Sequence, residues 1–336
     1  MMRSHYIGEV SQADEGKTVS LAGWVHETRT FGKINFILLR DRSGIMQVIL
    51  KEGEASEKLI ELSKKLIKET SIIVKGKVRS TKMANLGREL VPESIEVVGE
   101  VLKQVPFEVT GKVPAEIDVR LDNRFIDLRR LETQAIFKIR SQIQMAFREK
   151  LMEQKFQEIN PPSLVAAATE GGTDLFEVKY FEKKAFLAQS PQLYKQLAVM
   201  GGMDKVFMIC PIWRAEKHNT TQHLNEITQM DIEMGFANDE DALDVLESVF
   251  LHILNSVKQN CQDQLKTLKV ELEVPTKVNR HIYTDLVNLL NKHGFKMEWG
   301  EDFSKENEAH LFALLKEEAF FITKWPTNVR AFYSMP

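Results

Sequence analysis

Arg214 and Glu216 directly follow the apolar run VFMICPIW, and the polar loop HNTTQ comes soon after them. The chain then returns through NEITQMDIEM, in which acidic and apolar residues alternate. A guanidinium binds a carboxylate or a phosphate in a bidentate fork and stays charged while doing so. Where a carboxylate attacks a phosphate, a shared cation that positions both groups and stabilises the developing charge supplies most of the catalysis. This stretch therefore suits chemistry between a carboxylate and a phosphate.

Two further clusters mix polar groups with strand-like apolar residues, TEGGTDLF at 169–176 and QSPQLYKQ at 189–196. Polar residues interrupt the apolar patterns of these clusters at Glu170, Gln192 and Lys195. Such interruptions tend to mark functional sites. The alternative is that they are solvated ends of surface strands, which suits a lone charge better than a cluster. Lys195 is a point charge suited to a distal carboxylate.

Several other chemistries are excluded by the motifs that the sequence lacks. It contains no Ser/His/Asp order, no glycine-rich nucleotide loop and no HExxH. His218 and His223 lie in a polar loop, and we interpret them as solvated side chains rather than metal ligands. Cys210 and Cys261 lie far apart without a CxxC pattern, which argues against a disulfide framework or a zinc ribbon.

Composition and the N-terminus indicate a cytoplasmic protein. No run approaches the ~20 apolar residues of a membrane span, and MMRSHYIGEV lacks the apolar core of a signal peptide. We therefore expect no membrane association. The net charge of -3 gives no general attraction for nucleic acid, so any such contact must be a local patch.

The elements that position these residues begin with five short strands between residues 18 and 101, with a helical insert around SEKLIELSKKLIKE. Tight turns are expected at Gly32-Lys33 and Ser43-Gly44. Five strands with one helix between the third and fourth is the order of an OB-fold barrel, a platform for single-stranded nucleic acid. The aromatic residues of these strands could equally be ordinary core residues: Trp24, Phe31 and Phe36.

A second, larger region follows a stretch rich in proline and charge, so the sequence predicts two domains. Apolar residues at helical spacing predict a helix through QAIFKIRSQIQMAFREKLMEQKF, and it ends before the paired prolines of FQEINPPSL. A further helix is predicted over DEDALDVLESVFLHILNSVKQN, with Asp239 as its N-cap. The expected domains are 1–103 for the barrel, 104–130 for a linker and 131–336 for an α+β catalytic region.

Taken together, the motifs resemble the archaeal-type aspartyl-tRNA synthetases, class II enzymes with an N-terminal OB-fold anticodon-binding domain. The resemblance rests on TEGGTDLFEVKYFEKKAFLAQSPQLYKQ and RAEKHNTTQHLNEITQMDIEM, and on five shorter stretches: GWVHE, INFILLRDRSGIMQV, RLDNRFIDLRR, FQEINPPSL and FITKWPTNVRAFYSMP. It covers the whole chain. It implies an antiparallel sheet flanked by helices, and a homodimer with Pro162 near the interface.

The resemblance also implies roles for particular residues. Arg214 would be the catalytic residue, contacting both the amino-acid carboxylate and the α-phosphate of ATP. The residues implied to contact ATP are Arg214, Ala215, Glu216, Gln222, His223 and Leu224. Those implied to line the aspartate pocket are Glu170, Gln192, Leu193, Tyr194, Lys195 and Arg214. On the barrel, Phe36 would stack on an anticodon base and Gln47 would read a base edge, which fits aromatic and amide side chains.

Two positions bear on specificity. A desolvated ammonium at Lys195 pairs with a carboxylate but leaves an amide poorly satisfied, so QSPQLYK favours aspartate over asparagine. Related asparaginyl enzymes resemble QSSQLYL here, without the lysine. His26 lies where enzymes of this type help to read the last anticodon base, and histidine there resembles the enzymes that charge both tRNA(Asp) and tRNA(Asn).

The chain departs from the family in two ways. The glycine-rich third motif and the acidic SGGQR-like stretch that binds Mg²⁺ are not found, since the last glycine is Gly300. Gln222 stands where the loop usually carries arginine. We therefore expect a chain that is incomplete or half of a split enzyme and that alone is a weak or inactive ligase. The alternatives are a catalytically inactive tRNA-binding fragment and an asparaginyl-tRNA synthetase.

Overall fold

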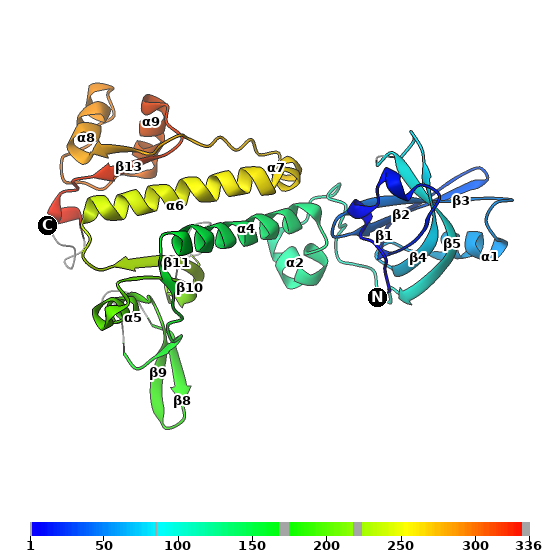
Figure 1. Ribbon diagram of the computed structural model, residues 1–336, viewed down its shortest axis with the longest axis horizontal. Helices are drawn as coiled ribbons and strands as arrows, with labels where there is room; N and C mark the ends of the chain where they lie inside the picture. Colours follow the sequence, from blue (N-terminus) through cyan, green and yellow to red (C-terminus); the bar gives the residue numbers. More distant parts are fainter. Residues whose placement is uncertain (1, 85, 168–174, 218–223, 331–336) are drawn as a thin grey trace. The chain divides into compact units, whose positions relative to one another are not determined.

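The computed structural model describes residues 2–84, 86–167, 175–217 and 224–330. The chain divides into two compact units, residues 1–136 and 137–336 (Figure 1). The first unit carries the barrel and the second carries the motifs that contain Lys195 and Arg214.

The first unit is built on a closed five-stranded barrel with the strand order β1-β2-β3-β5-β4. Helix α1 (Glu57–Lys65) lies between the third and fourth strands in sequence, so the predicted OB-fold order is confirmed. The strands are β1 (Thr18–Phe31), β2 (Ile34–Asp41), β3 (Gly44–Lys51), β4 (Ser71–Ser80) and β5 (Arg88–Gly99). Two short 3₁₀ turns precede them, η1 (Ile7–Glu9) and η2 (Gln12–Asp14).

The alternation of β2 separates the barrel core from its outer surface. Ile37 and Leu39 point inward and are fully buried, whereas Phe36 and Leu38 are half-buried on the outer face. Phe31 is 66% exposed, so it is not a core residue. The inner residues complete one apolar core with their neighbours on the other strands, among them Leu21, Val48, Val74 and Leu90.

The segment after the barrel contains two short helices, α2 (Ile117–Asp122) and α3 (Arg124–Asp127). Asp127 is fully buried, and its carboxylate accepts a hydrogen bond of 2.7 Å from Arg120 and another from Arg124. A small apolar cluster, Phe107, Val109 and Ile126, packs beneath these helices. The segment is therefore ordered by its own contacts.

The second unit is organised around a three-stranded sheet of order β11-β10-β6. Strands β10 (Lys205–Trp213) and β11 (Glu226–Met234) are antiparallel, and the short β6 (Gln157–Glu158) pairs parallel to β10. Two long helices, α4 (Leu131–Glu153) and α6 (Asp239–Asn260), pack on one face of the sheet (Figure 1). The core between them is formed by Phe147, Leu151, Phe156, Phe207 and Val249.

Both long helices confirm the prediction from apolar periodicity, but the predicted N-cap of α6 is wrong by one residue. The side chain of Asn238 accepts a hydrogen bond from the backbone N–H of Asp241, and the carboxylate of Asp241 accepts one from the backbone N–H of Asn238. Asp239 is the first helical residue instead, where its negative charge suits the positive end of the helix dipole.

Shorter elements complete the second unit. A small sheet of order β7-β9-β8 contains β7 (Leu164–Val165), β8 (Glu177–Tyr180) and β9 (Lys183–Leu187). The remaining elements are α5 (Gln192–Ala198), the π-turn η3 (Val199–Met203), α7 (Gln262–Leu268), β12 (Asn279–Ile282), α8 (Tyr283–Lys292), α9 (Lys305–Leu315), β13 (Phe320–Thr323) and η4 (Thr327–Val329). None of the helices in the described ranges is long and apolar enough to cross a membrane.

Candidate functional site

Lys195 lies in helix α5 and is only 6% exposed, which is unusual for a lysine. Its Nζ lies 2.8 Å from Oδ1 of Asp231 and 3.4 Å from Oε2 of Glu233, and both carboxylates belong to β11. A buried ammonium is stable only when it is paired and hydrogen-bonded. The two acidic residues therefore supply the partners that this buried side chain needs beside the sheet.

The alternation of β11 explains why these carboxylates gather at one place. Gln229, Asp231 and Glu233 point to one face, while Ile232 and Met234 pack against the helices on the other face. The amide Nε2 of Gln229 donates to Asp231 over 3.1 Å. Sequence reasoning assigned no role to these acidic residues, although their alternation with apolar residues was a signal that they share one face.

Gln192 joins the same network from the first turn of α5. Its Nε2 donates to Glu233 over 3.4 Å, and its backbone N–H donates to the hydroxyl of Ser190. The thiol of Cys210 lies close by on β10, and burial, followed by the charge of Asp231, raises its pKa. The thiol therefore stays protonated, and the ionic character of the site rests on Lys195 and its partners.

Arg214 follows the last residue of β10 and is half-buried. Its backbone N–H donates to the carbonyl of Asn225 over 2.9 Å, and the Asn225 amide donates to the carbonyls of Arg214 and Glu216, each over 2.9 Å. Asn225 thus ties together the ends of β10 and β11, a role that the sequence did not indicate. Continuing the alternation of β10 places Arg214 on the same face of the sheet as Asp231.

A second candidate site is a groove of about 470 Å³ on the outer surface of the barrel. Phe36 and Gln47 both line it, and the ring of Phe31 meets that of Phe36 edge to face at 6.2 Å. The amide Nε2 of Gln47 donates to the buried carboxylate of Glu89 over 2.8 Å. Glu89 also accepts from Arg79, so the Gln47 side chain is anchored by a partner that sequence reasoning missed.

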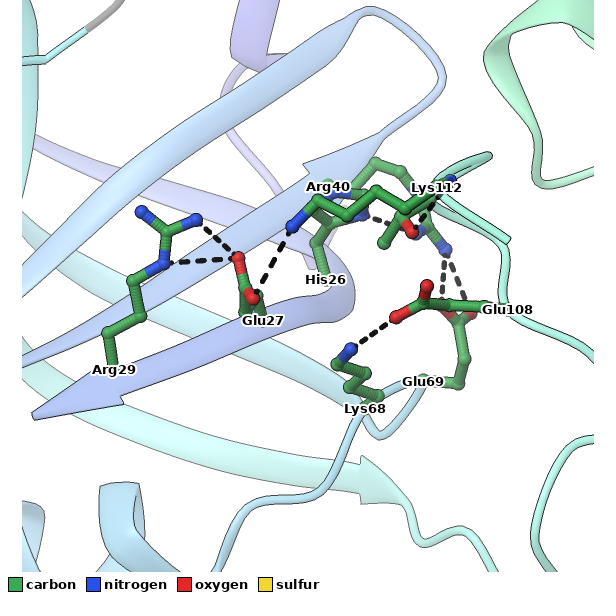
Figure 2. A network of polar contacts seen from close by, with 9 residues as sticks. His26, Glu27, Arg29, Arg40, Lys68, Glu69, Glu108 and Lys112 are labelled. Carbon is green, nitrogen blue, oxygen red and sulfur yellow. Dashed lines mark hydrogen bonds and ion pairs between the residues drawn. The ribbon is translucent and has the colours of Figure 1, made fainter.

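The third predicted barrel residue, His26, belongs to a network of charged side chains (Figure 2). Nη1 of Arg40 lies 2.8 Å from Nδ1 of His26, and Nη2 of Arg40 donates to both oxygens of Glu69, over 2.9 and 2.8 Å. Glu69 also accepts from Arg129 over 2.8 Å. Burial lowers the pKa of His26 below its ordinary value, and the positive charge of Arg40 lowers it further.

The lowered pKa makes His26 a source of pH-dependent stability. Between its ordinary pKa, roughly 6.5, and its lowered folded value, the unfolded chain binds a proton that the folded chain does not. The stabilising contribution is therefore full above the ordinary pKa and is lost as the pH falls towards the folded value. We expect an NMR titration of the His26 ring in the native chain to show a midpoint below that of an unstructured histidine. A midpoint at or above the ordinary value contradicts this prediction.

Two family descriptions match this chain. Residues 19–98 match the OB-fold nucleic acid binding domain, and residues 116–336 match the tRNA synthetases class II (D, K and N). The chain belongs to the class II tRNA synthetases. The predicted fold, an OB-fold barrel followed by a class II synthetase domain, is therefore confirmed, and the chain is an aminoacyl-tRNA synthetase by family.

This class II synthetase is 45% identical over 335 residues to the aspartate–tRNA(Asp/Asn) ligase of Methanocaldococcus jannaschii, covering 99% of the chain and 76% of that relative. It is 47% identical to the ligase of the same name from Methanopyrus kandleri, covering 100% of the chain and 78% of that relative. Among solved structures, the asparaginyl-tRNA synthetase of Pyrococcus horikoshii with asparaginyl-adenylate matches with a TM-score of 0.91 and 32% identity, over 99% of the chain and 77% of that structure.

The structure of this synthetase places the residues implied by the resemblance as follows. Gln192 and Lys195 both contact Glu233. Leu193 of the same helix is exposed and Tyr194 is half-buried. Ala215 and Glu216 are half-buried beyond β10, Leu224 is exposed, and Pro162 is exposed. Other expected site residues lie outside the described residues: Glu170, Gln222 and His223. The assigned roles of all these residues stay predictions.

Proposed function

We propose that this synthetase is an aspartate–tRNA ligase that activates aspartate with ATP and transfers it to tRNA(Asp) and tRNA(Asn). The observation that carries the proposal is the buried ammonium of Lys195, which shares one face of the sheet with Arg214. A desolvated cation selects a substrate carboxylate over the amide of asparagine. Relatives named aspartate–tRNA(Asp/Asn) ligase support the same substrates.

The proposed first step joins aspartate to AMP. Lys195 pairs with the side-chain carboxylate, and Glu170, Gln192, Leu193 and Tyr194 line the rest of the pocket. Arg214 holds the α-carboxylate against the α-phosphate of ATP, where its two parallel donors neutralise both anions. The carboxylate oxygen bonds to the α-phosphorus, the bond from that phosphorus to the bridging oxygen breaks, and pyrophosphate leaves. Arg214 stabilises the charge that builds up on the phosphoryl oxygens.

In the second step a terminal ribose hydroxyl of the tRNA attacks the carbonyl carbon of aspartyl-adenylate, loses its proton, and AMP leaves. The proposed contacts to ATP in the first step are Ala215, Glu216, Gln222, His223 and Leu224. The resemblance implies Mg²⁺, but the described residues include no group of three or more potential ligands that could hold a metal ion. We therefore assign no residue to Mg²⁺ and describe no step that depends on it.

Aspartate-dependent exchange of pyrophosphate into ATP tests the proposed activation without any tRNA. Because the third motif is not found, we expect the 336-residue chain to exchange only weakly with aspartate as substrate, and to show much less exchange with asparagine. Preference for asparagine supports the alternative suggested by the match to asparaginyl-tRNA synthetase. Absence of exchange combined with retained tRNA binding supports a chain that only binds tRNA, and contradicts the proposal.

The barrel groove is the proposed anticodon site, with Phe36 stacking on a base and Gln47 and His26 contacting base edges. Base stacking on an aromatic ring contributes about 1–3 kcal/mol per base, so Phe36→Ala should weaken binding of an anticodon stem-loop by roughly 5- to 150-fold. Fluorescence anisotropy with a labelled stem-loop measures this loss. Phe312→Ala, which removes a half-exposed aromatic residue of the second unit, is the matched control and should bind normally.

We also propose a cytoplasmic homodimer with Pro162 near its interface. Helix α4 supports the association, because it leaves large apolar side chains exposed along its length, including Met145 and Met152. Leu164, two residues after Pro162, is exposed as well. The boundaries 1–103, 104–130 and 131–336 stay a proposal for the functional domains.

A further inference from the structure

His26 occupies an irregular position on the barrel surface. Val25 pairs with Leu39 and Glu27 pairs with Leu38, so His26 is the extra residue of a β-bulge in β1. Bulges redirect a side chain away from the regular alternation of a strand. Leu38, the partner of Glu27, lines the groove that contains Phe36 and Gln47. The bulge therefore sets His26 apart from the regular alternation of β1, next to Glu27, whose partner Leu38 lines that groove.

The contact with Arg40 determines which ring nitrogen carries the proton. A guanidinium has only donors, so the 2.8 Å contact requires Nδ1 of His26 to accept. In the neutral ring the proton then resides on Nε2. Nε2 has no hydrogen-bond partner among the described residues and is not one of their buried unpartnered atoms, so this N–H is open to a ligand.

Arg40 is held in place from its other side. It is 2% exposed although it lies on the same strand face as Phe36, because Glu69 covers it. Glu69 has a φ of 70°, a left-handed conformation that is strained for a residue with a side chain. Its backbone N–H donates to the carbonyl of Val25 over 2.8 Å, next to the bulge. The carboxylate of Glu69 also accepts a hydrogen bond from Arg129.

Burial and the charged groups that face His26 together favour the neutral ring. Arg40 on β2 and Lys112 in the segment after the barrel oppose protonation, whereas Glu69 and Glu27 favour it less strongly than burial and Arg40 oppose it. Lys112 lies 3.7 Å from Glu27 and partly neutralises it. The neutral form with a proton on Nε2 is therefore the form that meets a ligand near neutral pH.

We propose that Arg40 is a positioning residue for tRNA choice: it holds His26 as an Nε2–H donor that bonds to the O2 carbonyl of the last anticodon base. The inference rests on the proposed function of the barrel. The anticodons of tRNA(Asp) and tRNA(Asn) end in cytosine and uracil. Both pyrimidines carry the O2 acceptor, and they differ at position 4, where cytosine has an amino donor and uracil a carbonyl acceptor. A fixed donor directed at O2 accepts both bases.

Nitrogen-15 NMR of the histidine rings in the native chain tests the first half of the proposal without any substitution. We expect the His26 ring at neutral pH to carry its proton on Nε2 and to leave Nδ1 unprotonated. In Arg40→Met, which removes the donor, the ring should become a mixture of both tautomers with a higher titration midpoint. A proton on Nδ1 in the wild-type chain overturns the proposal, and that spectrum decides even where Arg40→Met fails to fold.

Binding of two anticodon stem-loops, identical except for a final cytosine or uracil, tests the second half. The wild-type chain should bind both with affinities within about threefold, and Arg40→Met should weaken both by about fivefold, the equivalent of one hydrogen bond. The loss should vanish when Arg40→Met is made in a His26→Ala background. An equal loss in that background overturns the positioning role, whereas a wild-type chain that binds neither loop refutes the proposed anticodon site itself.

Discussion

Replacement of Lys195 by methionine should lower the affinity for aspartate by about 100-fold or more while changing the affinity for asparagine far less. Removing one partner of a desolvated ion pair costs about 2–5 kcal/mol, because the other charge is left buried without compensation. The amide of asparagine has no net charge to leave unpaired, so the effect is selective. Isothermal titration of the 336-residue chain with each amino acid measures both affinities without requiring catalysis.

The same substitution leaves Asp231 and Glu233 without the ammonium that lies 2.8 and 3.4 Å from them. A loss of binding could then reflect a disturbed sheet rather than a lost contact. The matched control is Lys195→Met combined with Asp231→Asn, which restores the local charge balance. It should recover the thermal stability of the wild-type chain but not aspartate binding. Equal losses for aspartate and asparagine would remove the assignment of Lys195 to the side-chain carboxylate.

Replacement of Arg214 by alanine should reduce aspartate-dependent pyrophosphate exchange by about 10³-fold. An arginine that stabilises the charge of a phosphoryl-transfer transition state contributes roughly 10³ to 10⁵ in rate. No other described side chain forms an ion pair with Arg214, so alanine should leave the sheet intact while removing the cation. Arg214→Lys restores the charge but not the two parallel donors, and it should recover only part of the rate.

The control for general effects of losing an arginine is Arg148→Ala. Arg148 lies on α4, partly exposed, and pairs with Glu158 over 3.0 Å, so it lies in the same unit but is assigned no contact with a substrate. Its exchange rate should match that of the wild-type chain. Unchanged exchange in Arg214→Ala would refute the catalytic assignment, whereas equal losses in both variants would indicate a general effect on folding.

The periodicity of apolar residues predicts those helices and strands whose buried face is specified by a short stretch of sequence. The alternation of INFILLRD specifies a strand with one buried face, and the spacing of Phe147 and Leu151 specifies the apolar stripe of α4. Boundaries were less accurate, as the N-cap at Asn238 rather than Asp239 shows. Either residue type caps a helix well, so only the backbone geometry distinguishes them.

The residues of the candidate site were likewise predicted only in part. The sequence identified Lys195, Gln192 and Arg214 because a polar residue in an apolar pattern is visible in a short window. It did not identify Asp231 or Glu233 as partners of Lys195, since these residues lie 36 and 38 positions further along the chain. Their pairing depends on α5 packing beside β11, which no short stretch of sequence contains.

By itself, the sequence determined the order of the barrel strands, the two long helices and the residue types available for binding an amino acid, ATP and an anticodon. Only the tertiary structure decided the charge, the tautomer and the burial of those side chains. Arg40 alternates outward like Phe36, yet it is buried in the folded chain, where it pairs with Glu69 and contacts His26. Charge, tautomer and burial depend on groups that are distant in sequence and meet only in the folded chain, because desolvation strengthens an electrostatic contact only where the chain excludes water.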